Sequence, residues 1–366
     1  MIVSIICIIM LCLCIAKPKN KYIFLISLIV MWVIMTYITG NADESVYMSR
    51  YNNPADWALN SELLFQWLNV TCNKIGLSFT QYKGVLAFII LALIGSSIWK
   101  LSKYPNIVVV FYFLCPFPLN VSQLRFALAS AIFVYGYRYL ISNDAKTKKI
   151  FGKACIVSDI KYICCVLIAS LIHSVSIIWL VLLVVKKLTV KQTAVFTMIF
   201  SIFIYFFFNP SSVSWLLRKL GAFSRMNAYF SDAYQNSSYR HYGLTTITVI
   251  GLLGIYIICC LLSKKNKGST TKQIETLLKF NIFSLSMIAF ILRYTSEMYR
   301  PQEGLMLLNY ILLTNQYENG KILLFKGKKK EVYLKLLLFL AVIMAFVMKI
   351  LLFNYTNVWK PMFFRR

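Results

Sequence analysis

The sequence predicts an all-α, polytopic integral membrane protein, a single membrane domain over residues 1–366 with about 10–12 membrane segments. Composition is the first reason: 59% of the residues are hydrophobic, only 14% are charged, and the mean hydropathy is +0.69. A water-soluble fold could not cover that much apolar side chain. The second reason is the pattern, in which apolar runs alternate with short loops rich in lysine and arginine.

The first half of the chain provides five apolar runs. The run at 2–16 has no basic residue before it and several lysines after it, so we interpret it as a transmembrane helix rather than a signal peptide. The other predicted crossings lie at 22–39, 83–99, 107–119 and 124–141. Because basic loops stay on the cytoplasmic side, the predicted inside loops are 17–22, 100–105 and 142–161. We therefore expect the loop 40–82 and the bend at Pro116–Pro118 to lie outside.

Residues 162–185 are predicted to form a re-entrant or short helical hairpin that turns near His173. Basic residues flank the run, which places both of its ends inside, and it is too short for two spans of about 20 residues each. The later apolar runs lie at 192–208, 244–263, 277–292, 304–317 and 333–353. The remaining basic loops, 264–272 and 321–335, are predicted inside, so the loop 209–243, the segment 293–302 and the C-terminal tail are expected outside.

Charge and cysteine content exclude several classes of protein. The formal net charge of +27 arises from lysines and arginines clustered in the short loops, so it indicates topology and not a nucleic-acid partner. Most of the ten cysteines lie inside apolar runs, without metal-ligand spacing and with only two histidines in the chain. We therefore expect no metal and no cofactor. The sequence also lacks the G-x-S-x-G, GxxxxGK[ST] and H-E-x-x-H motifs.

Arg125 stands at the start of the apolar run 124–141, where an unpaired guanidinium costs about 3 kcal/mol or more. Such a charge indicates an anionic ligand, an internal partner or an ion path; the alternative is an arginine that extends to the membrane interface. The predicted topology gathers eight charged or titratable residues in the outer half of the membrane, which indicates one external site. They are Asp43, Glu44, Arg125, His173, Arg225, Arg293, Glu297 and Arg300.

Three further patterns support a site there. Arg293, Glu297 and Arg300 would share one face if their segment were helical, although an interfacial salt-bridge cluster would show the same spacing. His173 suits either a proton carrier or a buried packing residue. The spacing Asp43-x3-Tyr47-x3-Tyr51 places a carboxylate and two phenols on one helical face. It is the least consistent with a merely solvated loop.

The loop 209–243 mixes aromatic and charged residues. Aromatic rings pack against sugars and neighbouring polar groups bond their hydroxyls, so the loop favours sugar binding. An aromatic belt at the membrane interface has the same composition. The residues are Trp215, Arg218, Arg225, Tyr229, Asp232, Tyr234, Tyr239, Arg240, His241 and Tyr242.

The order of these landmarks resembles the EpsG family of bacterial exopolysaccharide and capsule proteins, similar in role to the Wzy O-antigen polymerases. The resemblance covers roughly residues 20–320. It rests on Asp43-x3-Tyr47-x3-Tyr51, Glu62-Leu-Leu-Phe, Gln123-Leu-Arg125-Phe-Ala127, His173-Ser174, Phe223-x5-Tyr229 and Glu297-Met-Tyr-Arg300. Arg125-Phe-Ala127 departs from the usual Arg-Gln-Gly/Ala pattern of the family.

The resemblance implies a membrane glycosyltransferase-type polymerase of surface polysaccharide. It would join oligosaccharide repeat units carried on undecaprenyl pyrophosphate at the outer face of the bacterial cytoplasmic membrane. The expected partners are this lipid-linked oligosaccharide, the membrane itself, a chain-length regulator and a flippase. A lipid-linked oligosaccharide flippase or transporter is the alternative, but its charges should line a path through both leaflets. A membrane O-acyltransferase is a further alternative, although no Asn or second His accompanies His173 in the expected way.

Residue roles follow from the chemistry of this reaction. Guanidinium groups bind phosphate oxygens in pairs and stay protonated, whereas a carboxylate or imidazole can accept the proton of the acceptor hydroxyl. The predicted catalytic residues are Asp43, Glu44 and His173. The predicted substrate-binding residues are Arg125, Arg293, Arg300, Glu297, Tyr47, Arg225 and Tyr229.

Overall fold

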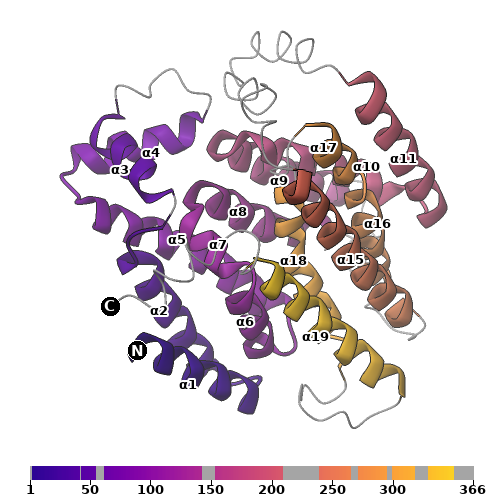
Figure 1. Cartoon of the computed structure of the whole chain (residues 1–366), viewed down its shortest axis with the longest axis horizontal. Helices are drawn as coiled ribbons and strands as arrows, with labels where there is room; N and C mark the ends of the chain where they lie inside the picture. The colour runs from indigo at the N-terminus through magenta and orange to yellow at the C-terminus, as the bar shows by residue number, and fades with distance from the viewer. Residues whose placement is uncertain are drawn as a thin grey trace.

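Helices form the regular structure of every segment that the computed structural model describes, and these segments contain no strand (Figure 1). The described residues are 2–41, 43–54, 62–141, 153–208, 239–264, 271–294, 299–317 and 329–349. The predicted all-α membrane fold is confirmed. Four helical stretches are each long and apolar enough to cross a membrane: Phe79–Leu101, Val190–Phe207, Gly243–Ser263 and Lys272–Arg293.

Up to residue 141, the described residues form eight helices where the sequence predicted five crossings. They are α1 (Ile2–Ala16), α2 (Lys21–Tyr37), α3 (Glu44–Asn52), α4 (Leu63–Lys74), α5 (Phe79–Leu101), α6 (Pro105–Leu114), α7 (Phe117–Ser122) and α8 (Leu124–Ile141). Helix α2 begins where the Asn20 side chain accepts hydrogen bonds from two backbone amides, and α5 begins with a capping box between Ser78 and Gln81. Two of the three extra helices, α3 and α4, lie within the predicted loop 40–82.

The predicted crossing at 107–119 is wrong as a single helix. Helix α6 ends at Leu114, and a separate six-residue helix, α7, follows. Pro116 and Pro118 explain the break, because proline supplies no backbone N–H and fits only the first turn of a helix. The bend predicted at Pro116–Pro118 is therefore present, and it leads into the start of α8.

The predicted hairpin at 162–185 is confirmed, with a longer outgoing leg. Helix α9 (Lys153–Ile172) leads to an extended residue, His173, and the chain returns through the 3-10 helix η3 (Ser174–Val181) and α10 (Leu182–Lys187). Tyr162 Oη donates to the Trp179 carbonyl at 2.8 Å, and Lys186 Nζ lies 3.1 Å from Asp159 Oδ1. The start of one leg and the end of the other therefore lie together.

In the second half of the chain, the residues that the structure describes form seven further helices. They are α11 (Val190–Ile202), the π-helix η4 (Phe203–Phe207), α15 (Tyr239–Lys264), α16 (Thr271–Ser284), α17 (Met287–Arg293), α18 (Arg300–Thr314) and α19 (Lys329–Lys349). Helix α8 packs against both α5 and α9, while α18 contacts α6, α8 and α16. The segments α5 to α8 thus occupy the middle of the bundle (Figure 1).

Loops that the sequence assigned to the cytoplasmic side meet at one end of the bundle, which we call the basic-loop end. Asn106 Nδ2 donates to the Lys17 carbonyl at 2.5 Å, which joins the loops after α1 and α5. Tyr104 Oη donates to the Tyr317 carbonyl at 3.0 Å, which adds the end of α18. Helix α5 ends at the basic-loop end, so its first residues and the α2–α5 connection lie at the opposite end of the bundle. We call that opposite end the site end.

Two asparagines fasten α16 to α18 inside the bundle. Asn281 and Asn309 are both buried, and each amide donates to the other side-chain oxygen, at 2.8 and 3.0 Å. Such reciprocal pairing satisfies both amides in a region without water.

Replacing Asn281 with leucine is expected to destabilise the protein by about 1 kcal/mol, because the Asn309 amide then loses its interhelical partner. The double variant Asn281→Leu/Asn309→Leu is expected to lose less than the sum of the two single variants. Thermal unfolding of the purified protein in detergent measures all three. Strictly additive losses would show that the amides do not act as a pair.

Candidate functional site

Helix α3 carries the predicted face of one carboxylate and two phenols. Asp43 precedes the first turn, and Tyr47 and Tyr51 follow on the buried side of the helix. The Tyr51 ring stacks on Tyr82 of α5 at 4.6 Å between centroids, and the Tyr47 ring meets Phe65 of α4 edge-on at 6.1 Å. These rings fix α3 against α4 and α5, and Asp43 lies at the end of that face.

Arg125 lies in the first turn of α8 and is held inside the protein. Its Nη1 donates to the Glu62 carboxylate, and its guanidinium carbon lies 5.7 and 5.9 Å from the ring centroids of Tyr47 and Phe65. Its backbone N–H donates to Tyr47 Oη at 3.5 Å. The side chains of both Arg125 and Glu62 are mostly buried. This arrangement rules out an arginine that merely extends to the interface, and it supports the internal-partner interpretation.

Three arginines from three helices act on the Asp43 carboxylate. Burial raises the pKa of Asp43, while the charges of Arg300, Arg125 and Arg50 lower it, and the net effect is an increase. Arg300 begins α18, Arg125 belongs to α8 and Arg50 to α3. With Glu62 included, the cluster contains three guanidinium groups and two carboxylates, so it carries net positive charge. We call these five residues the arginine cluster.

His173 lies beside the first turn of α8. It is 3% exposed at the turn of the hairpin, and its ring meets the Phe126 ring edge-on at 5.6 Å. Phe126 directly follows Arg125, so His173 contacts the residue next to Arg125 in the first turn of α8.

Glu44 forms contacts that connect three helices. Its carboxylate lies 3.0 Å from Lys83 Nζ and also accepts the backbone N–H of Gly40. Lys83 donates in addition to the Ile38 carbonyl at 2.6 Å. Gly40 has φ +85°, a conformation that glycine adopts without strain. Glu44 and Lys83 therefore join the end of α2, the start of α3 and α5.

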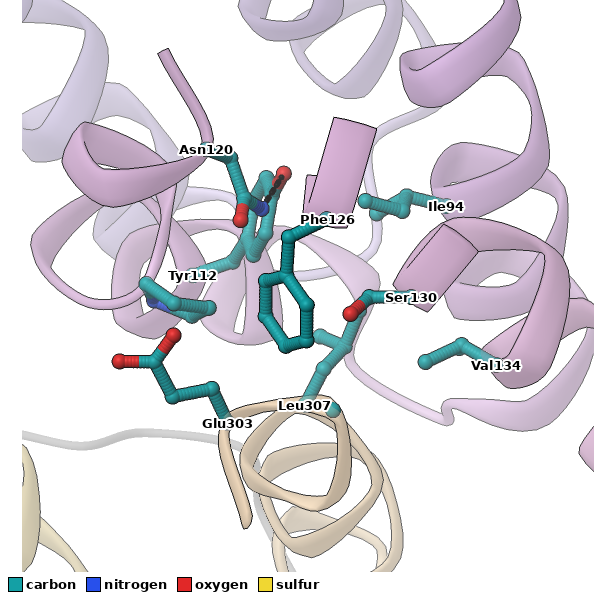
Figure 2. Close-up of a pocket in the computed structure, with 10 residues that line it drawn as sticks. Ile94, Tyr112, Asn120, Phe126, Ser130, Val134, Glu303 and Leu307 are labelled. Atoms are coloured by element: carbon teal, nitrogen blue, oxygen red, sulfur yellow. Dashed lines mark hydrogen bonds between the residues drawn. The ribbon is translucent and has the colours of Figure 1, made fainter. Parts of the chain in front are cut away.

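A small pocket of about 10 Å³ lies behind Phe126, with the space of roughly one water molecule. Its polar lining comprises Tyr112, Asn120, Ser130 and Glu303. Asn120 Nδ2 donates to Tyr112 Oη at 2.8 Å. Figure 2 shows the Glu303 side chain extending from α18 into the pocket, on the side where Tyr112 and Asn120 lie.

Three charged residues of this region were not among the predicted site residues. Glu62 pairs with Arg125, Arg50 acts on Asp43, and Glu303 is buried (2% exposed) with a side-chain hydrogen bond to Tyr299. A signal existed for Glu303, because a carboxylate just before the apolar run 304–317 is costly in a membrane. Arg50 had a weaker signal as the neighbour of Tyr51.

The expected shared helical face of Arg293, Glu297 and Arg300 is wrong. Helix α17 ends at Arg293, Tyr294 has non-helical backbone angles, and α18 begins at Arg300. Pro301 suits the first turn of a new helix, which explains the interruption. Arg293 is exposed and bonds to Tyr294, whose hydroxyl donates to the Phe208 carbonyl at 2.5 Å. The structure thus places Arg293 in a different contact group from Arg300.

Three predicted site residues lie outside the described residues. They are Glu297, Arg225 and Tyr229, and most of the loop 209–243 lies there as well. Among the residues that the structure describes, no three His, Cys, Asp or Glu side chains group together as metal ligands. The arginine cluster instead has the chemistry of an anion site, since charged donors bind phosphate oxygens strongly.

Comparison with known proteins gives a family-level result. The sequence model described as the EpsG family matches residues 21–361. No curated protein and no solved structure matches the chain.

Proposed function

The chain belongs to the EpsG family, and from that premise we propose that it is the enzyme that polymerises a surface polysaccharide. It would join oligosaccharide repeat units carried on undecaprenyl pyrophosphate, at the outer face of the bacterial cytoplasmic membrane. The family consists of exopolysaccharide-related membrane proteins, and the helical fold agrees with that setting. The substrate, the reaction and the outer face belong to the proposal.

The observation that carries the proposal is the arginine cluster. The charges of Arg50, Arg125 and Arg300, which belong to three separate helices, all act on the Asp43 carboxylate. With Glu62 included, three guanidinium groups face two carboxylates, and the remaining positive charge favours the binding of an anion. A lipid-linked sugar diphosphate supplies that anion at the membrane surface. Arginine suits it because the planar guanidinium binds two phosphate oxygens at once and stays charged.

In the proposed reaction, an acceptor hydroxyl attacks the anomeric carbon of the donor sugar. The new bond joins the acceptor oxygen to that carbon, and the bond from the carbon to the pyrophosphate oxygen breaks. Arg125 and Arg300 stabilise the charge that develops on the leaving pyrophosphate. The hydroxyl proton passes to Asp43, which lies among these arginines and is poised as an acceptor by its raised pKa. His173 is the second candidate acceptor, because its ring contacts Phe126, the residue next to Arg125.

The remaining predicted residues receive narrower roles. Arg225 and Tyr229 are proposed to bind sugars from the loop 209–243, and Glu297 to orient arginines. Arg293 would contact the glycan at the margin of the site, because it lies exposed at the end of α17. Glu44 would hold α3 in place through Lys83.

The two ends of the bundle support the proposed outer location. The basic-loop end contains the lysine-rich turns that the positive-inside rule assigns to the cytoplasm. The arginine cluster lies at the site end, next to the α2–α5 connection. Charges gathered at one end suit a reaction on one face, whereas a flippase needs polar groups along a path through the membrane.

Replacing Arg125 with lysine is expected to lower polymer synthesis about 10- to 100-fold. Lysine keeps the charge but loses paired bonding to phosphate, a loss of roughly 1.5–3 kcal/mol. Mass analysis of lipid-linked oligosaccharides tests it, in cells that lack the protein and carry each variant. Single repeat units should accumulate at the outer face. Arg138→Lys, at the other end of the same helix, is the matched control and should support full polymer.

Two other outcomes would contradict the proposal. Repeat units trapped on the cytoplasmic face of deletion cells would identify a flippase. Unchanged glycan length with altered acetylation would identify an acyltransferase.

A further inference from the structure

Helix α4 exposes large apolar side chains on its outward side and buries a polar side chain on its inward side. Leu63, Trp67 and Ile75, the last just beyond the helix, are 59%, 59% and 69% exposed. The buried residues are Phe65, Asn69 and Cys72, and Asn69 is 2% exposed. On a helix that faces water, the exposed positions would be polar.

Specific bonds fix the polar face inward. Glu62, directly before α4, pairs with Arg125. The Gln66 side chain donates to the Pro54 carbonyl, and Asn73 Nδ2 donates to the Tyr51 carbonyl at 3.0 Å. Rotation of α4 that hid its apolar residues would break all three contacts. The exposed apolar stripe is therefore a fixed feature of the fold.

The surroundings identify what covers this stripe. The chain continues from Ile75 into α5, which is long and apolar enough to cross a membrane and which exposes Val85 and Phe88 within its first three turns. Helix α4 therefore directly precedes a helix that is long and apolar enough to span the membrane. In Figure 1, α3 and α4 lie together at the margin of the bundle.

We propose that α4 is an interfacial helix that lies in the outer leaflet of the membrane, with Leu63, Trp67 and Ile75 in contact with lipid. Its 12 residues extend only about 18 Å, too short to cross a hydrocarbon core of about 30 Å. Tryptophan favours the membrane–water interface, and the exposed Lys74 at the helix end can reach the headgroups. The proposal does not depend on which reaction the site performs.

The interfacial position sets the depth of the arginine cluster. Glu62 bonds Arg125 and is adjacent to Leu63, the first residue of the stripe. A helix seated among the headgroups therefore holds Arg125 near the level of lipid phosphates. This would allow a lipid-anchored anion to reach the arginines from the side, without leaving the membrane.

The test is fluorescence quenching of the full-length protein in vesicles of phosphatidylethanolamine and phosphatidylglycerol. The difference in emission between wild type and Trp67→Phe reports Trp67 alone. We expect lipids brominated near the headgroup to quench this difference signal at least twofold more than aqueous acrylamide does. Trp179→Phe is the matched control, since Trp179 is 3% exposed and its difference signal should resist both quenchers.

Two results would overturn the proposal. Strong quenching of Trp67 by acrylamide, with little effect of brominated lipid, would place α4 in water. Resistance to both quenchers, as for Trp179, would show that protein, such as a second copy of the chain, covers the stripe. If Trp67→Phe folds poorly, Leu63→Trp provides the same difference measurement one turn away.

Discussion

Replacing Asp43 with asparagine is expected to lower the rate of polymer synthesis about 100- to 10,000-fold, the usual effect of losing a general base. Asparagine has nearly the same shape but cannot accept the proton of the acceptor hydroxyl. The measurement is the initial rate with purified lipid-linked repeat units and protein reconstituted in vesicles. Retention of more than about a tenth of the wild-type rate would move the proton-accepting role to His173.

The pH dependence separates catalysis from folding in the same variant. Wild-type activity should fall as the pH decreases through the raised pKa of Asp43, because the protonated carboxyl accepts no proton. The free energy of unfolding should change with pH in the opposite direction. Because the pKa of Asp43 is raised in the folded state, its protonated form favours folding, and this contribution to stability is lost as the pH rises through that pKa. Asp43→Asn should therefore be at least as stable as wild type near neutral pH. A less stable variant would indicate a structural role for this carboxylate.

Replacing Lys83 with methionine is expected to destabilise the protein by about 3–5 kcal/mol, the cost of leaving a buried charge without its partner. Lys83 and Glu44 are both buried, and their pairing joins α2, α3 and α5. The expected result is a large decrease in thermal stability in detergent and in the amount of protein that reaches the membrane.

The double variant Lys83→Met/Glu44→Gln is the control for this experiment. It removes both charges and retains an amide oxygen that can accept the Gly40 N–H, so most of the lost stability should return. Equal instability of the single and double variants would mean that Lys83 acts through packing, including its position over the Phe79 ring. A double variant that folds but makes no polymer would return Glu44 to the list of catalytic candidates.

Most of the fold followed from the apolar runs and the basic loops between them. The hairpin was predicted because Lys161 and Lys186 had to lie on the same side, and the contact between Asp159 and Lys186 agrees. Helix ends were harder to predict. Local rules for proline predict the break at Pro116. The interruption between Arg293 and Arg300 depends on Pro301 starting a new helix. The spacing of the charged residues there favoured one continuous helix instead.

A site residue could be predicted from the sequence where its charge or its spacing is unusual for the segment that contains it. Arg125 was identifiable because its segment is apolar, and Asp43 because its spacing matched Tyr47 and Tyr51. Glu62 was harder to place, since its partner Arg125 is 63 residues away and no local pattern encodes that pairing. Arg50 gave no comparable signal, because a charged residue is common in a loop such as the predicted loop 40–82. Such long-range pairs become visible only when the helices are packed.

The pairing of Glu62 with Arg125 has a consequence for turnover. The Glu62 carboxylate is the resident counter-ion of Arg125, so in the proposed reaction a phosphorylated lipid would have to exchange with it. This exchange would weaken binding of the donor, but it would also limit product inhibition. The released lipid pyrophosphate would carry more negative charge than the sugar-linked donor and would otherwise bind more tightly. Return of Glu62 to Arg125 would compete with the spent carrier and clear the site for the next repeat unit.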